Sequence, residues 1–213
     1  MLFDLDGTLL DTLQDLTDAT NYALCTFGYP QRSKEEIRRF VGNGALRQIT
    51  LALPEGADVP VEQVLSVYKS YYAAHCADVT APYPGIEAVL AQLAQDYSLG
   101  IVTNKPDAMT QKLCKTWFDG IFALGECPDR ARKPAADMVH FAMAQLGVTQ
   151  CVYVGDSEVD IRTAQNAGLP CIAVTWGFRD VQVLRSVGAV WLCHRVEELP
   201  AMIEKVLGEY HGK

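Results

Sequence analysis

Short, continuous apolar runs alternate with helix-like segments through the second half of the chain, and this alternation limits the possible folds more than any other feature. The runs LGIVTN (99–104), CVYVGD (151–156) and PCIAVTWG (170–177) each have the length of one strand. Segments with apolar residues at three- and four-residue intervals separate them. Strands that are apolar on both faces are typical of parallel sheets with helices on either side. The pattern therefore predicts an α/β fold.

A long segment near the start of the chain shows only helical periodicity. Residues 14–80 contain repeated three- and four-residue apolar spacings, and Ser33 and Glu36 match the capping box that opens a helix. No alternating or continuous strand pattern interrupts them. We therefore predict a helical domain at 14–80, inserted into a core domain that is formed by 1–13 and 81–213.

Composition limits the partners that this protein could have. Of the 213 residues, 49% are hydrophobic and 21% are charged, which is typical of a packed, soluble domain. The formal net charge of −8 and the lack of a basic stripe argue against nucleic acid as a partner. No apolar run reaches the roughly 18 residues of a membrane span. Seven cysteines without a C-x-x-C pair favour a reducing, cytoplasmic compartment.

Polar side chains follow three of the expected strands. Asp4 and Asp6 end LFDLD, Thr103 and Asn104 end IVTN, and Asp156 ends VYVGD. In open parallel α/β sheets, ligands bind outside the carboxyl ends of the strands. We therefore expect these side chains to converge on one site, although Thr103 and Asn104 could also only cap the following segment.

The first of these strand ends places two carboxylates two residues apart. In an extended strand, Asp4 and Asp6 would start on the same side, and their like charges would repel unless a cation or a shared proton offset them. A calcium loop of the EF-hand type is excluded, because it would need Gly at Leu9 and Glu at Asp15. A turn in which both aspartates serve as caps remains an alternative.

Two further residues complete a set that suits phosphoryl transfer. Lys133 could be a solvated surface lysine, and Asp160, one helical turn after Asp156, could only stabilise a helix N-terminus. Taken together with the strand-end residues, they offer a carboxylate nucleophile, oxygen ligands for Mg²⁺ and positive charge for a phosphate. The combination is far less expected by chance than any one of its members.

The segments FDLDGTLLDT, IVTNKP, RKP and VGDSEVDIRTAQNAG resemble, in this order, the four motifs of the haloacid dehalogenase superfamily of phosphohydrolases. The resemblance covers essentially the whole chain. It implies a Rossmann-like, three-layer core with a parallel sheet and an all-helical cap of the C1 type, inserted after the first strand. That arrangement agrees with the helical segment at 14–80.

The resemblance also implies roles for individual residues. Asp4 would be the nucleophile, Asp6 the general acid and base, and Lys133 would steady the nucleophile and the phosphate. Thr103, with Asn104 beside it, would bind the phosphate. The expected Mg²⁺ ligands are Asp4, Asp6 through its backbone carbonyl, Asp156, and Asp160 either directly or as a partner of the ligands. Dehalogenases of the superfamily lack the second Asp and the metal, so Asp6 argues for a phosphatase.

The helical segment carries a possible substrate signal. FVGNGALRQITLAL, followed later by TNKP, is similar to the phosphoglycolate phosphatase group. Gly42 would allow close approach of the backbone to a ligand, and Asn43 or Arg47 could bind a carboxylate. The alternative is a flexible Gly-Asn-Gly break with Arg47 on a solvated face. The aromatic residues of 68–72 fit an ordinary helix face.

The sequence thus predicts a Mg²⁺-dependent phosphomonoesterase that acts through an aspartyl-phosphate on a small phosphorylated metabolite, with 2-phosphoglycolate favoured. The same chemistry on a sugar phosphate, a nucleotide or pyrophosphate is an alternative, as is a phosphomutase. A non-catalytic phospho-ligand-binding module would be expected to lack one of the reacting groups, and none is missing. The sequence assigns no oligomeric state.

Overall fold

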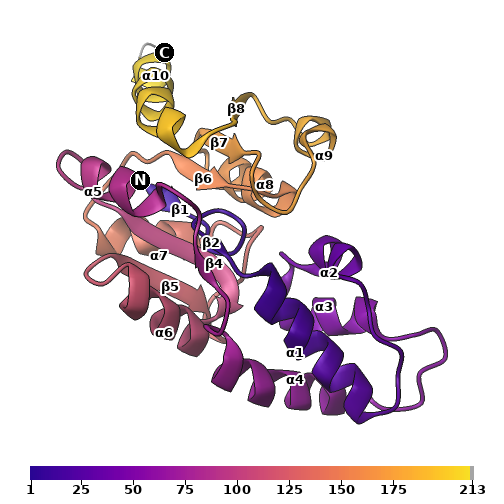
Figure 1. Ribbon diagram of the computed structural model, residues 1–213. Coiled ribbons are helices and arrows are strands. Elements are labelled where there is room, and N and C mark those ends of the chain that lie inside the picture. The colour runs from indigo at the N-terminus through magenta and orange to yellow at the C-terminus, as the bar shows by residue number, and fades with distance from the viewer. Residues whose placement is uncertain (212–213) are drawn as a thin grey trace.

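A parallel β-sheet forms the centre of the larger part of the molecule (Figure 1). The computed structural model describes residues 1–211. Six strands pair in the order β5-β4-β1-β6-β7-β8, and every pairing is parallel. The predicted α/β fold is therefore confirmed. The strands are β1 (Leu2–Phe3), β4 (Gly100–Pro106), β5 (Phe122–Glu126), β6 (Tyr153–Gly155), β7 (Cys171–Val174) and β8 (Trp191–Cys193).

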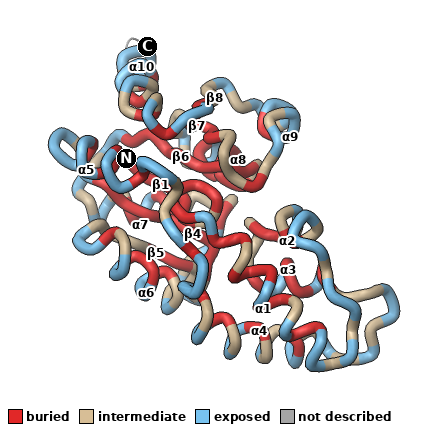
Figure 2. The backbone as a smooth tube through the Cα atoms, viewed as in Figure 1, coloured by how far each residue is buried: buried red, intermediate tan, exposed pale blue. Residues whose placement is uncertain are grey.

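Helices cover both faces of this sheet. Successive side chains of a strand point to opposite faces, and apolar side chains on each face pack against helices. Leu2 belongs to a buried cluster with Met138 of α7, whereas its neighbour Phe3 belongs to another with Leu90 of α5 and Ile203 of α10. Figure 2 shows the strands buried between the two layers. The helices of the core are α5 (Ile86–Leu93), α6 (Asp107–Trp117), α7 (Asp137–Gln145), α8 (Glu158–Asn166), α9 (Val181–Ser186), the 3₁₀ turn η1 (Val196–Glu198) and α10 (Leu199–His211).

Four helices form a separate group beside the carboxyl ends of the strands (Figure 1). They are α1 (Leu13–Thr26), α2 (Lys34–Phe40), α3 (Gly44–Ala52) and α4 (Val61–His75). Helix α1 packs against α2 and α4, and α3 packs against α2 and α4. This all-helical insertion confirms the expected combination of core and cap. The exact domain limits at 13/14 and 80/81 stay a prediction.

The cap joins the core through two chain segments that pair with each other. The outgoing strand β2 (Leu10–Asp11) and the returning strand β3 (Ala81–Pro82) form a small antiparallel sheet. Helix α2 begins at the predicted capping box, in which Ser33 and Glu36 each bond the backbone N–H of the other. Local sequence therefore sets the start of this helix correctly.

The first strand is shorter than the sequence indicates. Strand β1 ends at Phe3, Asp4 follows it directly, and Asp6 forms an isolated bridge with Leu10 across the turn at residues 7–9. Gly7 has a positive φ of 82°, and the backbone N–H groups of Leu9 and Leu10 both donate to the carbonyl of Leu5. Because the backbone bends here, strand alternation does not decide how the two carboxylates are oriented.

One buried carboxylate ties together the two segments that enter and leave the cap. Asp15, in the first turn of α1, is only 3% exposed. It accepts hydrogen bonds from the backbone N–H of Val79 at 3.1 Å, from the backbone N–H of Thr80 at 2.9 Å and from the Thr80 hydroxyl at 2.7 Å. The connection therefore does not depend on the two short strands alone.

Replacing Asp15 with Ala is expected to lower the free energy of unfolding by about 2 kcal/mol, because it leaves the buried backbone N–H and hydroxyl of Thr80 without their acceptor. Asp18→Ala is a matched control, because Asp18 is exposed on the same helix and accepts a hydrogen bond from the exposed Gln14 amide. Its effect should stay within about 0.5 kcal/mol. Urea denaturation of both variants measures this difference. Equal stability of the two variants would refute the role given to Asp15.

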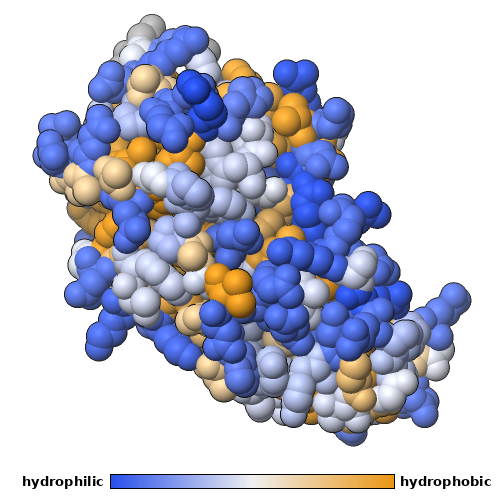
Figure 3. Space-filling view, viewed as in Figure 1, coloured by the Kyte–Doolittle hydropathy of each residue, from blue (hydrophilic) through white to orange (hydrophobic). Residues whose placement is uncertain are grey.

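Hydrophilic side chains cover much of the face seen in Figure 3. No helix among residues 1–211 is both long and apolar enough to cross a membrane.

Candidate active site

A pocket lies between the carboxyl ends of the core strands and the helical cap. Its empty volume is about 550 Å³, which includes space open to solvent. The core supplies Asp4, Asp6, Thr103 and Asp156 to its wall, and the cap supplies Gly42 among others. Residues from three strand ends and from the cap thus meet at one place.

Asp4 and Lys133 form the centre of a buried ionic group. Lys133 Nζ lies 2.9 Å from Asp4 Oδ1 and 2.7 Å from Asp160 Oδ1, and it donates to the hydroxyl of Tyr153 at 3.0 Å. Lys133 is 2% exposed and Asp4 is 7% exposed. A buried cation is stable only with such partners, so the alternative of a solvated surface lysine is excluded.

Asp160 holds this group in place from the start of α8. Its Oδ1 accepts from Lys133, and its Oδ2 accepts from the backbone N–H of Ser157 at 3.1 Å and from the Ser157 hydroxyl at 2.6 Å. Ser157 and Asp160 form a capping box. The capping role considered from the sequence is therefore real, and it coexists with the ion pair to Lys133.

Asp156 sits where two loops approach each other closely. Its Oδ2 accepts the backbone N–H of Phe178 at 2.6 Å, and its Oδ1 lies 3.4 Å from the Thr8 hydroxyl. A side chain at Gly177 would begin 2.3 Å from the Asp156 Cβ and 2.3 Å from the Gly7 carbonyl. Glycine is therefore required at 177 for the loop after β7 to reach the site.

Three buried carboxylates could hold a metal ion here. One oxygen from each of Asp4, Asp156 and Asp160 lies within 4.8 Å of the others. Burial raises the pKa of Asp4 to about 7, with a further increase from the charge of Asp160, although Lys133 opposes both. Burial also raises the pKa of Asp156, and the charges of Asp160 and Asp4 add to it. This crowding of acids with one lysine fits a divalent cation that binds oxygen ligands.

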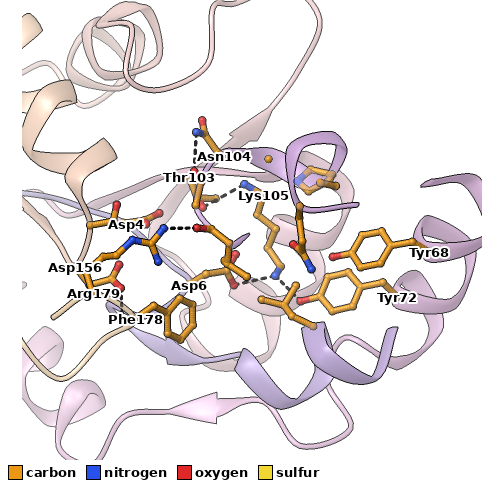
Figure 4. A pocket seen from close by; sticks show the side chains of 18 residues that line it. Asp4, Asp6, Tyr68, Tyr72, Thr103, Asn104, Lys105, Asp156, Phe178 and Arg179 are labelled. Atoms are coloured by element: carbon orange, nitrogen blue, oxygen red, sulfur yellow. Dashed lines mark hydrogen bonds and ion pairs between the residues drawn. The ribbon is translucent and has the colours of Figure 1, made fainter. Parts of the chain in front are cut away.

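Asp6 points toward a second lysine, which the sequence analysis did not single out. Lys105 Nζ lies 2.9 Å from Asp6 Oδ1 and 2.5 Å from the hydroxyl of Tyr72 on α4. Figure 4 shows Lys105 reaching from β4 to the space between Asp6 and the cap. Tyr72 and Tyr68 also line the pocket, although their spacing indicated only a helix face. The only available signal was the Lys-Pro pair in IVTNKP.

The predicted cap residues are only partly brought to the site. Gly42 lines the pocket, and its carbonyl accepts from the Asn104 amide at 3.1 Å; the same amide donates to the Lys133 carbonyl at 2.9 Å. Asn43 and Arg47 do not line the pocket, and Arg47 is exposed. The solvated alternative therefore describes Arg47 better than a role as carboxylate ligand.

Arg179, on the loop after β7, is another residue that the sequence analysis missed. Its guanidinium donates to the carbonyls of Arg38 at 2.8 Å and of Val41 at 2.6 Å, both at the end of α2, and pairs with Glu158 at 2.7 Å. Loop 175–180 therefore contacts Asp156 through the Phe178 N–H and the cap through Arg179. Figure 4 shows Arg179 beside Asp156 and Phe178.

Comparisons with known proteins show the family of this chain. A family model described as haloacid dehalogenase-like hydrolase matches residues 1–174. The chain belongs to this family. A phosphoglycolate phosphatase of Pseudomonas putida is 35% identical over 192 residues, which cover 84% of this chain and 70% of that protein. A phosphoglycolate phosphatase of Cereibacter sphaeroides is 32% identical and covers 97% of this chain and 98% of its own.

A solved structure is similar in fold to this hydrolase. A protein from Lactobacillus delbrueckii subsp. bulgaricus is 40% identical to it, with a TM-score of 0.88, and the match covers 93% of this chain and 95% of that one. The resemblance noted from the four motifs is therefore confirmed, and so is the expected type of enzyme, a hydrolase similar to phosphoglycolate phosphatases.

Proposed function

We propose that this hydrolase is a Mg²⁺-dependent phosphomonoesterase that acts through an aspartyl-phosphate on a small phosphorylated metabolite, with 2-phosphoglycolate as the preferred substrate. The observation that carries the proposal is the buried group of Asp4, Lys133, Asp156 and Asp160 at the edge of a pocket covered by the cap. It combines a carboxylate nucleophile with the charges that a phosphate and a cation need.

In the proposed reaction, a carboxylate oxygen of Asp4 attacks the phosphorus and the ester oxygen leaves. Asp6 gives its proton to the departing oxygen, so the first step yields the alcohol and a phosphorylated Asp4. Asp6 then takes a proton from water, which attacks the phosphorus and releases inorganic phosphate. Thr103 and Lys133 would bind the phosphoryl oxygens, since this chemistry depends on positioning and charge.

Asp4, Asp156 and the backbone carbonyl of Asp6 would hold the Mg²⁺ ion. When bound, Mg²⁺ supplies positive charge that offsets the carboxylates and the phosphate. Both oxygens of Asp160 already accept from Lys133 and Ser157. We therefore assign Asp160 to the orientation of Lys133 and of the loop that carries Asp156.

The names of the relatives and the character of the pocket support a small substrate. The Pseudomonas putida and Cereibacter sphaeroides relatives are both named phosphoglycolate phosphatases. Apolar and aromatic side chains, including Leu16, Val41, Ala45 and Tyr68, line the cap side of the pocket. We further propose that the enzyme acts in the cytoplasm on a free metabolite.

The test is phosphate release from 2-phosphoglycolate beside a sugar phosphate, a nucleoside monophosphate and pyrophosphate, each with and without Mg²⁺. We expect the highest kcat/KM for 2-phosphoglycolate and no turnover after removal of the metal with EDTA. A preference for another ester would keep the chemistry and reject the substrate. Absence of turnover with every compound would reject the enzyme and favour a binding module.

A further inference from the structure

We propose that Lys105 is the residue that selects the substrate, by binding a carboxylate one carbon away from the ester oxygen, and that Tyr72 of the cap holds it in position. This inference rests on the proposed phosphatase function and deepens it. It defines the substrate class as phosphate esters of short 2-hydroxy acids.

The first argument is the placement of a buried cation in the pocket wall. Lys105 is 4% exposed, and its ammonium group lies between the carboxylate of Asp6 and the hydroxyl of Tyr72. An ammonium group has three donors. The structure accounts for two of them, so one donor is free for a ligand in the pocket.

The second argument is that Lys105 is the cation of the pocket wall that pairs with Asp6, whereas Arg179 is bound to Glu158 and to the cap. Among the described residues that line the pocket, the cationic side chains are Lys105 and Arg179. The Nε, Nη1 and Nη2 atoms of Arg179 already donate to Glu158, Arg38 and Val41. Arg47, which the sequence suggested for this task, is exposed and outside the wall.

The third argument is the short path from the reacting oxygen to Lys105. Asp6 must lie within hydrogen-bond distance of the ester oxygen in order to protonate it. Lys105 Nζ lies 2.9 Å from Asp6 Oδ1. In the phosphate ester of a 2-hydroxy acid, a single carbon lies between the ester oxygen and the carboxyl carbon. The carboxylate can therefore reach Lys105 while the ester oxygen contacts Asp6.

The cap takes part in this recognition through Tyr72. Figure 4 shows Asp4 and Asp156 on one side of the pocket and Tyr68 and Tyr72 on the opposite side, with Asp6 and Lys105 between them. Tyr72 belongs to α4, whereas Lys105 belongs to β4 of the core. The hydroxyl of Tyr72 thus fixes the lysine only while the cap lies against the core, as it does here.

The experiment compares 2-phosphoglycolate with 2-hydroxyethyl phosphate, which replaces the carboxylate with a neutral CH₂OH group. We expect Lys105→Met to lower the ratio of the two kcat/KM values at least about 10-fold, the loss expected for a hydrogen bond to a charged group. Lys105→Arg should restore part of the ratio. Lys112→Met is the control, because Lys112 donates to the cap carbonyl of Ala73 but is exposed and outside the pocket wall.

A binding measurement separates failure of this inference from failure of the proposed function. In an Asp4→Asn background, calorimetric titration should show at least tenfold weaker binding of 2-phosphoglycolate after Lys105→Met, with 2-hydroxyethyl phosphate changed less than threefold. This readout needs no turnover. An equal loss for both esters would show that Lys105 acts only through Asp6 and would overturn the inference. Wild-type enzyme that does not distinguish the two esters would also overturn it, even if it is an active phosphatase.

Discussion

Asp4→Asn is expected to reduce kcat for 2-phosphoglycolate by at least about 10⁴-fold, because the amide cannot act as the nucleophile that starts the proposed reaction. The fold should survive the substitution. Asn has nearly the same shape, and Lys133 keeps its ion pair with Asp160. Steady-state phosphate release and thermal unfolding, measured on the same sample, test both statements.

The pKa of Asp4 adds a check that does not depend on turnover. The folded, metal-free protein raises this pKa from its ordinary value of 3.8 to about 7. The folded state therefore binds the proton more tightly than the unfolded state, and Asp4 lowers stability progressively as pH rises from about 4 through 7. Asp4→Asn removes this penalty, so the metal-free variant should gain stability relative to wild type at pH 8 but not at pH 4.

The exposed Asp18 provides the matched control for Asp4. Asp18→Asn removes a carboxylate from the surface of α1, outside the pocket, and should leave kcat within about threefold of wild type. Substantial activity of Asp4→Asn would show that another group attacks the phosphorus. The covalent mechanism would then have to be abandoned.

Asp156→Asn is expected to abolish the stabilisation of the protein by Mg²⁺. At a concentration about 100 times its dissociation constant, a ligand that binds only the folded state adds about 2.7 kcal/mol. For a protein of this size, that corresponds to a rise in Tm of roughly 5–10 °C. Asp156→Asn removes a charged oxygen ligand, while its amide oxygen can still accept the Phe178 N–H. Differential scanning fluorimetry with and without MgCl₂ measures the effect.

The stability of Asp156→Asn without Mg²⁺ serves as an internal comparison. Burial raises the pKa of Asp156 in the folded protein, so neutralising this side chain should not lower stability above neutral pH. Asp129→Asn, at an exposed site, is the control and should keep the full response to Mg²⁺. An undiminished rise in Tm for Asp156→Asn would remove Asp156 from the proposed metal site.

The positions of the core site residues could be predicted from the sequence because they depend on strand order and strand ends. The apolar runs around Thr103 and Asp156 predict parallel strands, and the carboxyl ends of parallel strands share one edge of the sheet. The Ser33 capping box is likewise a local property and occurs as expected. The fold and the meeting of Asp4, Thr103 and Asp156 follow from patterns within single segments.

Side-chain orientation could not be predicted in this way where the backbone departs from the regular alternation of a strand. Asp4 and Asp6 follow the end of β1, where the backbone bends and strand alternation no longer applies. They therefore pair with different lysines, Asp4 with Lys133 and Asp6 with Lys105. Lys105 lies where the register of β4 against β5 shifts between Val102 and Pro106. A shift in register changes the face of the sheet on which a side chain lies, so the two-residue alternation of a strand does not predict the orientation of Lys105.

Sequence by itself determined that this chain forms a parallel α/β core with a helical insertion and places its acids at the sheet edge. Only the tertiary structure decided which cap residues reach the pocket. On α3, Gln48 is buried and lines the pocket, while its neighbour Arg47 is exposed. Helical periodicity fixes the angle between these two side chains, but the packing of α3 against α4 and β4 decides which of them faces the core.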